Sequence, residues 1–215
     1  MLPQAYDFLA STSVIPVMVI EREADAIPMA EALVAGGIKV LEITLRTPCA
    51  LAAIKAISKA VPDAHVGAGT VCNSDDFSAA IDAGARFIVS PGQSDSLFDK
   101  SITSKTPLLP GAVTATEVMR AAEAGFKVLK FFPASTSGGA AAIKAFSGPF
   151  ASVSFVPTGG VGPKNLLEYL KLPNVQAAGG SWMLPKSKVQ AGDWQAVTQL
   201  CREASELSNM KELTQ

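Results

Sequence analysis

The sequence predicts an α/β protein that folds as a single (β/α)₈ barrel preceded by a short N-terminal helix. Eight short apolar segments alternate strictly with eight segments of helical periodicity, and no linker or low-complexity tract interrupts them. Strict alternation implies parallel strands joined by right-handed crossovers. Eight such units in one chain close most simply into a barrel.

An open, doubly wound sheet is the alternative architecture for the same alternation. That fold would need a glycine-rich dinucleotide-binding turn after the first strand, and Glu21-Arg22-Glu23 stands there instead. We therefore expect one domain over residues 1–215. It would consist of an N-terminal helix at 1–13, a barrel core at 14–191, and a C-terminal helix and tail at 192–215.

The first strand is predicted at Val14 to Ile20, a continuous apolar run rich in β-branched residues. Such a run is typical of a parallel strand that is covered on both faces. The remaining strands are predicted at 39–45, 65–71, 86–91, 107–113, 127–133, 154–160 and 175–182.

The helices of the barrel are bounded by recognisable start and stop signals. Asn73 and Thr114 stand where N-caps belong, and Gly84 and Gly125 stand where helices end. Pro48 is expected in the first turn of its helix. After the segment at 3–13, helices are predicted at 24–35, 48–60, 74–83, 94–104, 114–124, 138–146, 163–171 and 192–208.

The composition excludes several classes of partner. The net charge is −1 and no cluster of Lys or Arg is present, which argues against nucleic acid and anionic membranes. No apolar run is long enough to cross a bilayer, and no signal peptide is recognisable. Three cysteines without metal-type spacing indicate reduced thiols and a cytoplasmic location. His65 is the only histidine, which argues against a histidine-rich metal site and a histidine-centred triad. We expect no cofactor.

The sixth predicted strand carries a lysine in the middle of an apolar run. Alternation puts Val128, Lys130 and Phe132 on one face of that strand. An ammonium group is costly to desolvate, so burial favours the uncharged amine, a nucleophile that forms Schiff bases with ketones. The alternative is a lysine whose stem is buried and whose head reaches water.

The second predicted strand places Glu42, Thr44 and Arg46 on one face. We interpret the carboxylate and the guanidinium as buried site residues, because perturbed charges gather at functional sites. An internal ion pair is the structural alternative. On the third strand, Thr70 follows small residues and offers a hydroxyl group.

Paired glycines end the last two predicted strands, in Thr158-Gly159-Gly160 and Gly179-Gly180-Ser181. Backbone N–H groups in these two loops form the usual phosphate site of a barrel, so we expect a phosphorylated ligand. Ser90-Pro91-Gly92 and Pro110-Gly111 are more simply interpreted as turns.

Taken together, these motifs closely resemble the 2-keto-3-deoxy-6-phosphogluconate aldolases, class I lyases in one family with the 4-hydroxy-2-oxoglutarate aldolases. The resemblance runs from about Val14 to Trp194, and Lys130 with its Phe-Phe-Pro tail is its most specific part. The motifs are Glu42-Ile43-Thr44-Leu45-Arg46-Thr47, Gly67-Ala68-Gly69-Thr70-Val71, Ser90-Pro91-Gly92, Lys130-Phe131-Phe132-Pro133-Ala134, Pro157-Thr158-Gly159-Gly160 and Gly179-Gly180-Ser181-Trp182.

The resemblance implies a role for each matching position. Lys130 matches the Schiff-base lysine and Glu42 the general acid/base. The carboxylate end of the substrate would be held by Arg46 and Thr70, with Pro91 and Phe132 lining the same pocket. The phosphate end would be held by Thr158, Gly159, Gly160, Gly179, Gly180 and Ser181. The resemblance also implies a homotrimer that needs no metal and acts on a small phosphorylated keto acid.

The leading functional hypothesis is reversible cleavage of 2-dehydro-3-deoxy-6-phosphogluconate to pyruvate and glyceraldehyde 3-phosphate. Two alternative substrates stay open. One is the galactonate epimer of this compound, and the other is 4-hydroxy-2-oxoglutarate, which would be cleaved to pyruvate and glyoxylate. A sugar-phosphate isomerase or epimerase would share the barrel, but the metal-dependent epimerases need several histidines. A non-catalytic phosphate sensor would be expected to lack the lysine or the glutamate, and both are present.

Overall fold

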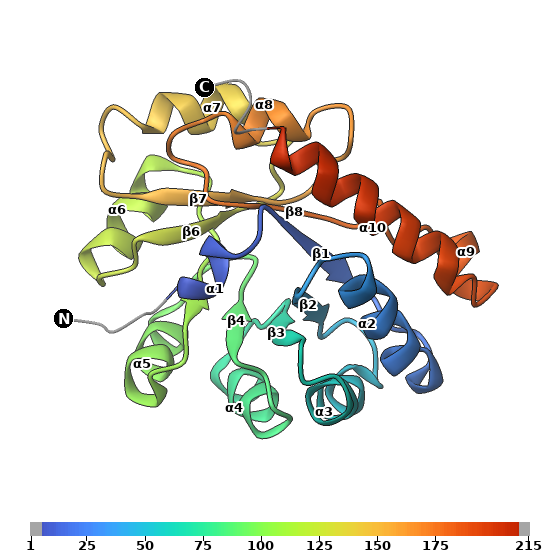
Figure 1. Cartoon of the computed structure of the whole chain (residues 1–215). Helices are drawn as coiled ribbons and strands as arrows, with labels where there is room; N and C mark the ends of the chain where they lie inside the picture. The colour runs from blue at the N-terminus through green and yellow to red at the C-terminus, as the bar shows by residue number, and fades with distance from the viewer. Residues whose placement is uncertain (1–5, 211–215) are drawn as a thin grey trace.

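The computed structural model describes residues 6–210, in which eight strands form a ring surrounded by helices (Figure 1). The strands are β1 Val14–Met18, β2 Val40–Thr44, β3 His65–Gly69, β4 Phe87–Val89, β5 Leu108–Leu109, β6 Val128–Phe131, β7 Ser154–Pro157 and β8 Ala178–Gly180. The helices are α1 Asp7–Ala10, η1 Glu23–Asp25, α2 Ala26–Ala35, α3 Ala50–Ala60, α4 Ser74–Asp82, α5 Asp95–Ser104, α6 Ala115–Glu123, α7 Gly139–Phe146, α8 Leu166–Leu170, α9 Lys186–Gln190 and α10 Trp194–Asn209.

The strands pair in parallel and close on themselves. Six follow the order β5-β4-β3-β2-β1-β8, and β6 pairs with β7. Bridges between Gly111 and Lys130 and between Thr158 and Gly179 join these two pieces at both ends. The predicted (β/α)₈ barrel is therefore confirmed, and the open doubly wound sheet is wrong.

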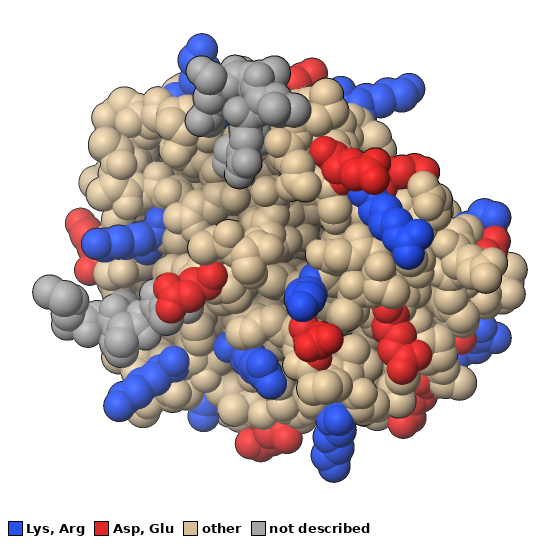
Figure 2. Space-filling view, viewed as in Figure 1, with Lys and Arg blue, Asp and Glu red and all other residues tan. Residues whose placement is uncertain are grey.

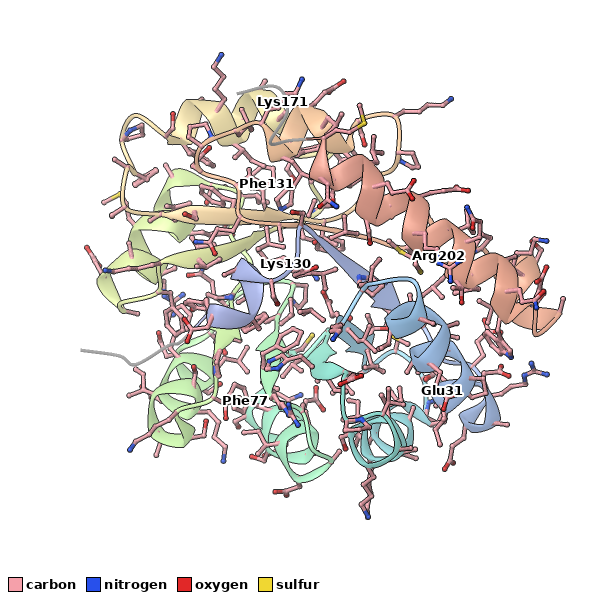
Figure 3. The ribbon with its side chains drawn as sticks, in the orientation of Figure 1. Glu31, Phe77, Lys130, Phe131, Lys171 and Arg202 are labelled. Carbon is pink, nitrogen blue, oxygen red and sulfur yellow. The ribbon has the colours of Figure 1, made fainter. Side chains whose placement is uncertain are left out.

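Alternating side chains separate the inside of the ring from the layer beneath the helices. Val40, Phe87 and Val128 belong to an inner cluster together with Phe8, which α1 places against one end of the ring. Phe131 belongs to the outer layer. Lys130 accordingly points inward and Phe131 outward, toward α7 (Figure 3). This confirms the face assignment that alternation predicts.

Every strand is shorter than its predicted segment, and β5 is the shortest. It contains only Leu108 and Leu109, because Pro107 and Pro110 flank it and neither can donate a ladder hydrogen bond. Beyond β5 the chain makes only the isolated bridge at Gly111.

The helix boundaries follow the caps where the caps are local. The Asn73 side chain accepts hydrogen bonds from two backbone N–H groups of α4, and Thr114 forms a capping box with Glu117 at α6. Gly84 and Gly125 both have positive φ, at 106° and 92°. These four capping predictions are confirmed.

Other helix ends differ from the prediction. Pro48 lies in a turn, and α3 starts at Ala50 because Thr47 and Cys49 tie the preceding loop to Ile20, two residues beyond β1. The predicted helix at 163–171 starts only at Leu166, since the Asn165 side chain accepts from Gly162 in a turn. The predicted helix at 3–13 is the short α1, with residues 3–5 outside the described part. The helical periodicity of the sequence did not predict α9.

The face shown in Figure 2 carries charges of both signs interspersed among uncharged side chains. No single-sign patch covers that face, in keeping with the net charge of −1. Between residues 6 and 210, no helix combines the length and the apolar character needed to cross a bilayer.

His65 lies within a stack of rings at the end of the barrel that α1 covers. Its ring centroid is 5.0 Å from that of Phe8 and 5.5 Å from that of Phe87, and both pairs are stacked. Its Nε2 atom is buried without a hydrogen-bond partner. Burial lowers the pKa of His65, and Arg86 lowers it further.

We expect the stability of the fold to fall on acidification because of His65. Since its folded pKa lies below the ordinary value of 6.5, the folded state binds fewer protons than the unfolded state. The contribution of His65 to the free energy of unfolding is fully present above pH 6.5 and is lost as the pH falls through the pKa of His65 in the folded state. Urea unfolding between pH 8 and 5 should show a smaller loss for His65→Phe than for the unmodified chain. Equal losses would mean that His65 does not carry the effect.

Candidate active site

A buried ion pair spans the inside of the barrel between β6 and β2. Lys130 Nζ lies 3.0 Å from Glu42 Oε1, and the two side chains are 4% and 3% exposed. No other ion pair in residues 6–210 is buried on both sides. The glycine at position 69 makes room, because a Cβ there would overlap the Glu42 carboxylate. The lysine is therefore sheltered beside the acid of the second strand, and the solvated-head alternative is wrong.

The pair has a chemical consequence for proton transfer. Lys130 and Glu42 together carry no net charge whether the proton sits on the amine or on the carboxyl group. A proton can thus pass between them without adding charge to a buried site, where an unpaired charge would be costly. The Phe132 ring lies 5.1 Å from Nζ, so its face stabilises the ammonium form.

Arg46 lies on the site side of the barrel, as alternation predicts, but it is not buried. It is exposed, and it makes no ion pair with Glu42. The expectation of a buried guanidinium is therefore wrong, because β2 ends at Thr44 and the chain then leaves the barrel interior. Arg46 Nε instead donates to Thr70 Oγ1 at 3.1 Å. Thr70 has a φ of 59°, a strained value for a β-branched residue.

Three side chains fasten the Arg46 loop to the end of β1. Thr44 Oγ1 donates to the Met18 carbonyl oxygen at 2.9 Å. Thr47 Oγ1 and Cys49 Sγ both donate to the Ile20 carbonyl oxygen, at 2.7 and 3.0 Å. Cys49 is a free thiol that serves here as a hydrogen-bond donor.

A cavity of about 140 Å³ opens where the strands end, at the face on which barrels carry their active sites. The structure brings eight of the predicted residues to its wall, together with Val17 and Val161, which were not predicted. The eight are Arg46, Lys130, Phe132, Thr158, Gly159, Gly160, Gly180 and Ser181. Glu42 contacts the cavity residue Lys130. Val17 could have been found from the sequence, because it shares the inward face of β1 with Ile15.

One end of this cavity is built from backbone in an unusual conformation. Gly159 and Gly160 have φ values of 95° and 75°. In the described part of the chain, no acceptor takes a hydrogen bond from the N–H groups of Gly160, Val161 or Ser181. Backbone N–H groups without an internal acceptor are the donors from which anion-binding nests are built.

Besides Glu42, three predicted residues lie outside the cavity wall. Thr70 contacts the cavity residue Arg46 but does not line the cavity itself. Gly179 leaves space for the Thr158 side chain, which a Cβ at position 179 would overlap. Pro91 is held away, because Gly111 packs against its backbone and donates to the Gly92 carbonyl oxygen at 2.9 Å.

No cluster of three or more His, Cys, Asp or Glu side chains suited to a metal ion occurs within residues 6–210. The chemistry available at the cavity is that of an amine, a carboxyl group, a guanidinium and a backbone nest.

A family model described as KDPG and KHG aldolase matches residues 6–200 of the chain. The chain belongs to the KDPG and KHG aldolase family. Among relatives in this aldolase family, the 2-dehydro-3-deoxy-phosphogluconate aldolase of Pseudomonas aeruginosa is 52% identical over 193 residues, covering 90% of this chain and 88% of the relative. The KHG/KDPG aldolase of Escherichia coli is 47% identical over 202 residues, covering 94% and 95%.

Solved structures of KDPG aldolases share the same barrel. The enzyme from Legionella pneumophila, with pyruvate captured at low pH as a covalent carbinolamine intermediate, superposes with a TM-score of 0.90. It is 46% identical, and the match covers 92% of this chain and 96% of that one. The Zymomonas mobilis enzyme with 3-phosphoglycerate gives a TM-score of 0.89 at 47% identity, covering 94% of this chain and 95% of that one.

Proposed function

We propose that this protein is a class I aldolase that reversibly cleaves 2-dehydro-3-deoxy-6-phosphogluconate to pyruvate and glyceraldehyde 3-phosphate. Lys130 forms the Schiff base and Glu42 moves the protons. The observation that carries the proposal is the buried Lys130–Glu42 pair, at 3.0 Å, beside a cavity that ends in a glycine nest. The KDPG aldolases named above are similar over most of the chain, which supports the same chemistry here.

The reaction begins when Lys130 passes a proton to Glu42 and its Nζ attacks the C2 ketone. A proton then moves from Nζ to the former ketone oxygen, which gives the carbinolamine. The carbinolamine hydroxyl takes a proton from Glu42 and leaves as water, which gives an iminium. Glu42 then accepts the proton of the C4 hydroxyl, the C3–C4 bond breaks, and its electron pair flows into the iminium to give an enamine. Protonation of C3 and addition of water release pyruvate and restore the amine. Covalent catalysis thus replaces one hard step with several easier ones.

The carboxylate end of the substrate would be held at Arg46. Its Nε atom is engaged with Thr70, which leaves the two terminal nitrogens for a bidentate contact with a carboxylate. Phe132 forms the adjoining wall, and Pro91 borders the same pocket only if its loop moves toward it. Thr70 would therefore act by orienting Arg46.

The phosphate end would be held by the nest after β7 and β8. The free N–H groups there suit a dianion, and the Thr158 and Ser181 side chains are the hydroxyl groups at this end. Gly159, Gly160 and Gly180 line the nest, and Gly179 gives space to Thr158. The distant phosphate holds the ketone in register with Lys130.

A second substrate, 4-hydroxy-2-oxoglutarate, is proposed for slower cleavage to pyruvate and glyoxylate. The Escherichia coli relative is named a KHG/KDPG aldolase, which supports this activity. A shorter substrate without a phosphate leaves the glycine nest unused, so its kcat/KM should be the lower of the two. Cleavage rates across the five-carbon substrate and the two six-carbon epimers measure this selectivity.

Trapping with borohydride tests the Schiff base directly. With pyruvate present, reduction should attach a stable three-carbon group to Lys130, identified by peptide mass mapping. Without pyruvate, no group should be attached. A chain that stays folded by circular dichroism but is not labelled would contradict the aldolase proposal and favour an isomerase or a sensor.

Removing the Ser181 hydroxyl should weaken phosphate binding. A hydrogen bond to a charged group contributes about 1.5–3 kcal/mol, so Ser181→Ala should raise KM for the phosphorylated substrate by about tenfold or more. Its kcat should stay close to normal, as should the labelling of Lys130 by pyruvate. If this KM does not change, Ser181 lies outside the phosphate site.

We also propose that the chain forms a homotrimer in the cytoplasm. Leu51 and Ile102 are large apolar side chains that stay exposed on the single chain, and all three cysteines are free. A related chain at 27% identity is part of a protein cage designed by fusing symmetric oligomeric domains, which supports self-association. Sedimentation at three times the chain mass of 22.2 kDa is expected, and a monomeric mass would contradict the trimer.

A further inference from the structure

A second cavity lies beside the first, over the end of β1 and next to α9. Its volume is about 220 Å³. Val17 and Ser181 line both cavities, so the two share a wall at the phosphate end of the candidate active site. The mechanism above makes no use of this space.

Five of the eleven residues that line the second cavity are aliphatic, and the others are charged or polar, including Ser181 and Gln190. Its aliphatic lining consists of Val17 and Val19 from the inward face of β1 and the segment after it, Met29 from α2, Leu184, and Val189 from α9. Val19 lines this cavity and remains 40% exposed. The aliphatic part of the lining therefore suits a hydrocarbon group.

The charged side chains around this cavity neutralise one another. Arg22 donates two hydrogen bonds to the buried Asp25, both at 2.8 Å. Lys186 Nζ lies 3.1 Å from Glu21 Oε1. Two cations are thus matched by two anions, so the cavity carries no surplus charge for a second phosphate.

We propose that this cavity, the acceptor-tail pocket, binds the hydrocarbon tail of an unphosphorylated aldehyde that serves as the acceptor in the reverse, carbon–carbon bond-forming reaction. The proposal rests on the proposed aldolase function. The carbonyl group of the aldehyde would lie at the Lys130 enamine, and the hydrocarbon tail of the aldehyde would pass Ser181 into the pocket. The volume is adequate, since an apolar cavity of about 150 Å³ accommodates a benzene ring.

The bond-forming step needs only groups already assigned. The enamine that pyruvate forms on Lys130 donates its C3 electron pair to the aldehyde carbon, which creates the new C–C bond. The carbonyl oxygen takes the proton held by Glu42 and becomes a hydroxyl group. Water then adds to the iminium and releases a 4-hydroxy-2-oxo acid, so pyruvate and the aldehyde are consumed one for one.

A series of straight-chain aldehydes from propanal to octanal, each supplied with pyruvate, tests the pocket. Because each methylene buried from water contributes about 0.8 kcal/mol, kcat/KM should rise by up to about fourfold per added carbon and then level off when the pocket is full. A kcat/KM that is independent of length would contradict the proposal.

Filling the pocket should remove this dependence on length. Val189→Phe and Leu184→Phe each place a ring in the cavity, and two variants guard against a folding defect in one. Both should flatten the series while leaving the reaction with glyceraldehyde 3-phosphate close to normal. Met119→Phe, at a residue that is 52% exposed on α6, is the matched control and should leave the series unchanged.

A direct binding measurement separates this proposal from the aldolase function itself. Saturation-transfer NMR with 1-hexanol, which cannot react, should show contact with the unmodified chain and lose it in Val189→Phe. Pyruvate labelling of Lys130 with no hexanol contact would overturn the pocket alone. Hexanol contact without labelling would overturn the aldolase function while leaving an apolar pocket. If Val189→Phe instead lowers the sedimented mass, the cavity is an interface between copies and the proposal is wrong.

Discussion

Lys130→Met should abolish cleavage, lowering kcat by at least about 10⁴-fold, because covalent catalysis has no substitute once the amine is gone. Methionine keeps an unbranched, apolar stem of similar length but supplies no nucleophile. Borohydride with pyruvate should then label no residue of the chain. The measurement is the rate of pyruvate release, followed with the purified variant at saturating substrate.

Lys127→Met is the matched control for this variant. Lys127 lies three residues earlier, at the start of the same strand segment, and it is exposed where Lys130 is buried. The control should keep both its turnover and its labelling. Appreciable turnover in Lys130→Met, or a loss of turnover in Lys127→Met, would show that the wrong lysine is assigned.

The stability of Lys130→Met should also fall, because the Glu42 carboxylate is left buried without its partner. Breaking a buried pair in this way costs about 3–5 kcal/mol. The double variant Lys130→Met/Glu42→Leu removes both charges and should recover most of that loss. The double variant should be stable and inactive. It therefore separates a loss of activity caused by unfolding from a loss caused by the missing amine.

The position of Lys130 could be predicted from the sequence because strand alternation has a period of two and no exceptions within β6. Once the apolar run was assigned to a strand, Lys130 had to share a face with Val128, and the structure places both inside the ring. Glu42 follows from the same rule on β2. The phosphate site was predicted at the glycines after the last two strands because a closed barrel brings these two loops together.

The same rule does not predict burial where strands end. Arg46 has the parity of Glu42, but β2 stops at Thr44, and parity does not say where a strand stops. Pro91 is displaced by a contact with Gly111 from another loop. The walls of the acceptor-tail pocket depend on contacts such as Lys186 with Glu21, 165 residues apart, which no local pattern encodes.

Glu42→Gln should lower kcat by about 10²–10⁴-fold, which is the usual contribution of general acid–base catalysis. Glutamine has the shape of glutamate and still accepts a hydrogen bond from Lys130, but it cannot take or give the proton that each step needs. Pyruvate should still be trapped on Lys130 by borohydride, only more slowly, because the nucleophile is intact. Single-turnover labelling rates measure that difference.

Glu31→Gln is the matched control for Glu42→Gln, since Glu31 projects from the outer face of α2 (Figure 3). It should change neither turnover nor the labelling rate. If Glu42→Gln kept normal turnover, another group would have to carry the protons. Within residues 6–210, however, the Glu42 carboxylate is the only acidic partner of Lys130, and it lies at 3.0 Å. The large expected loss therefore follows from the absence of any second acid beside the amine.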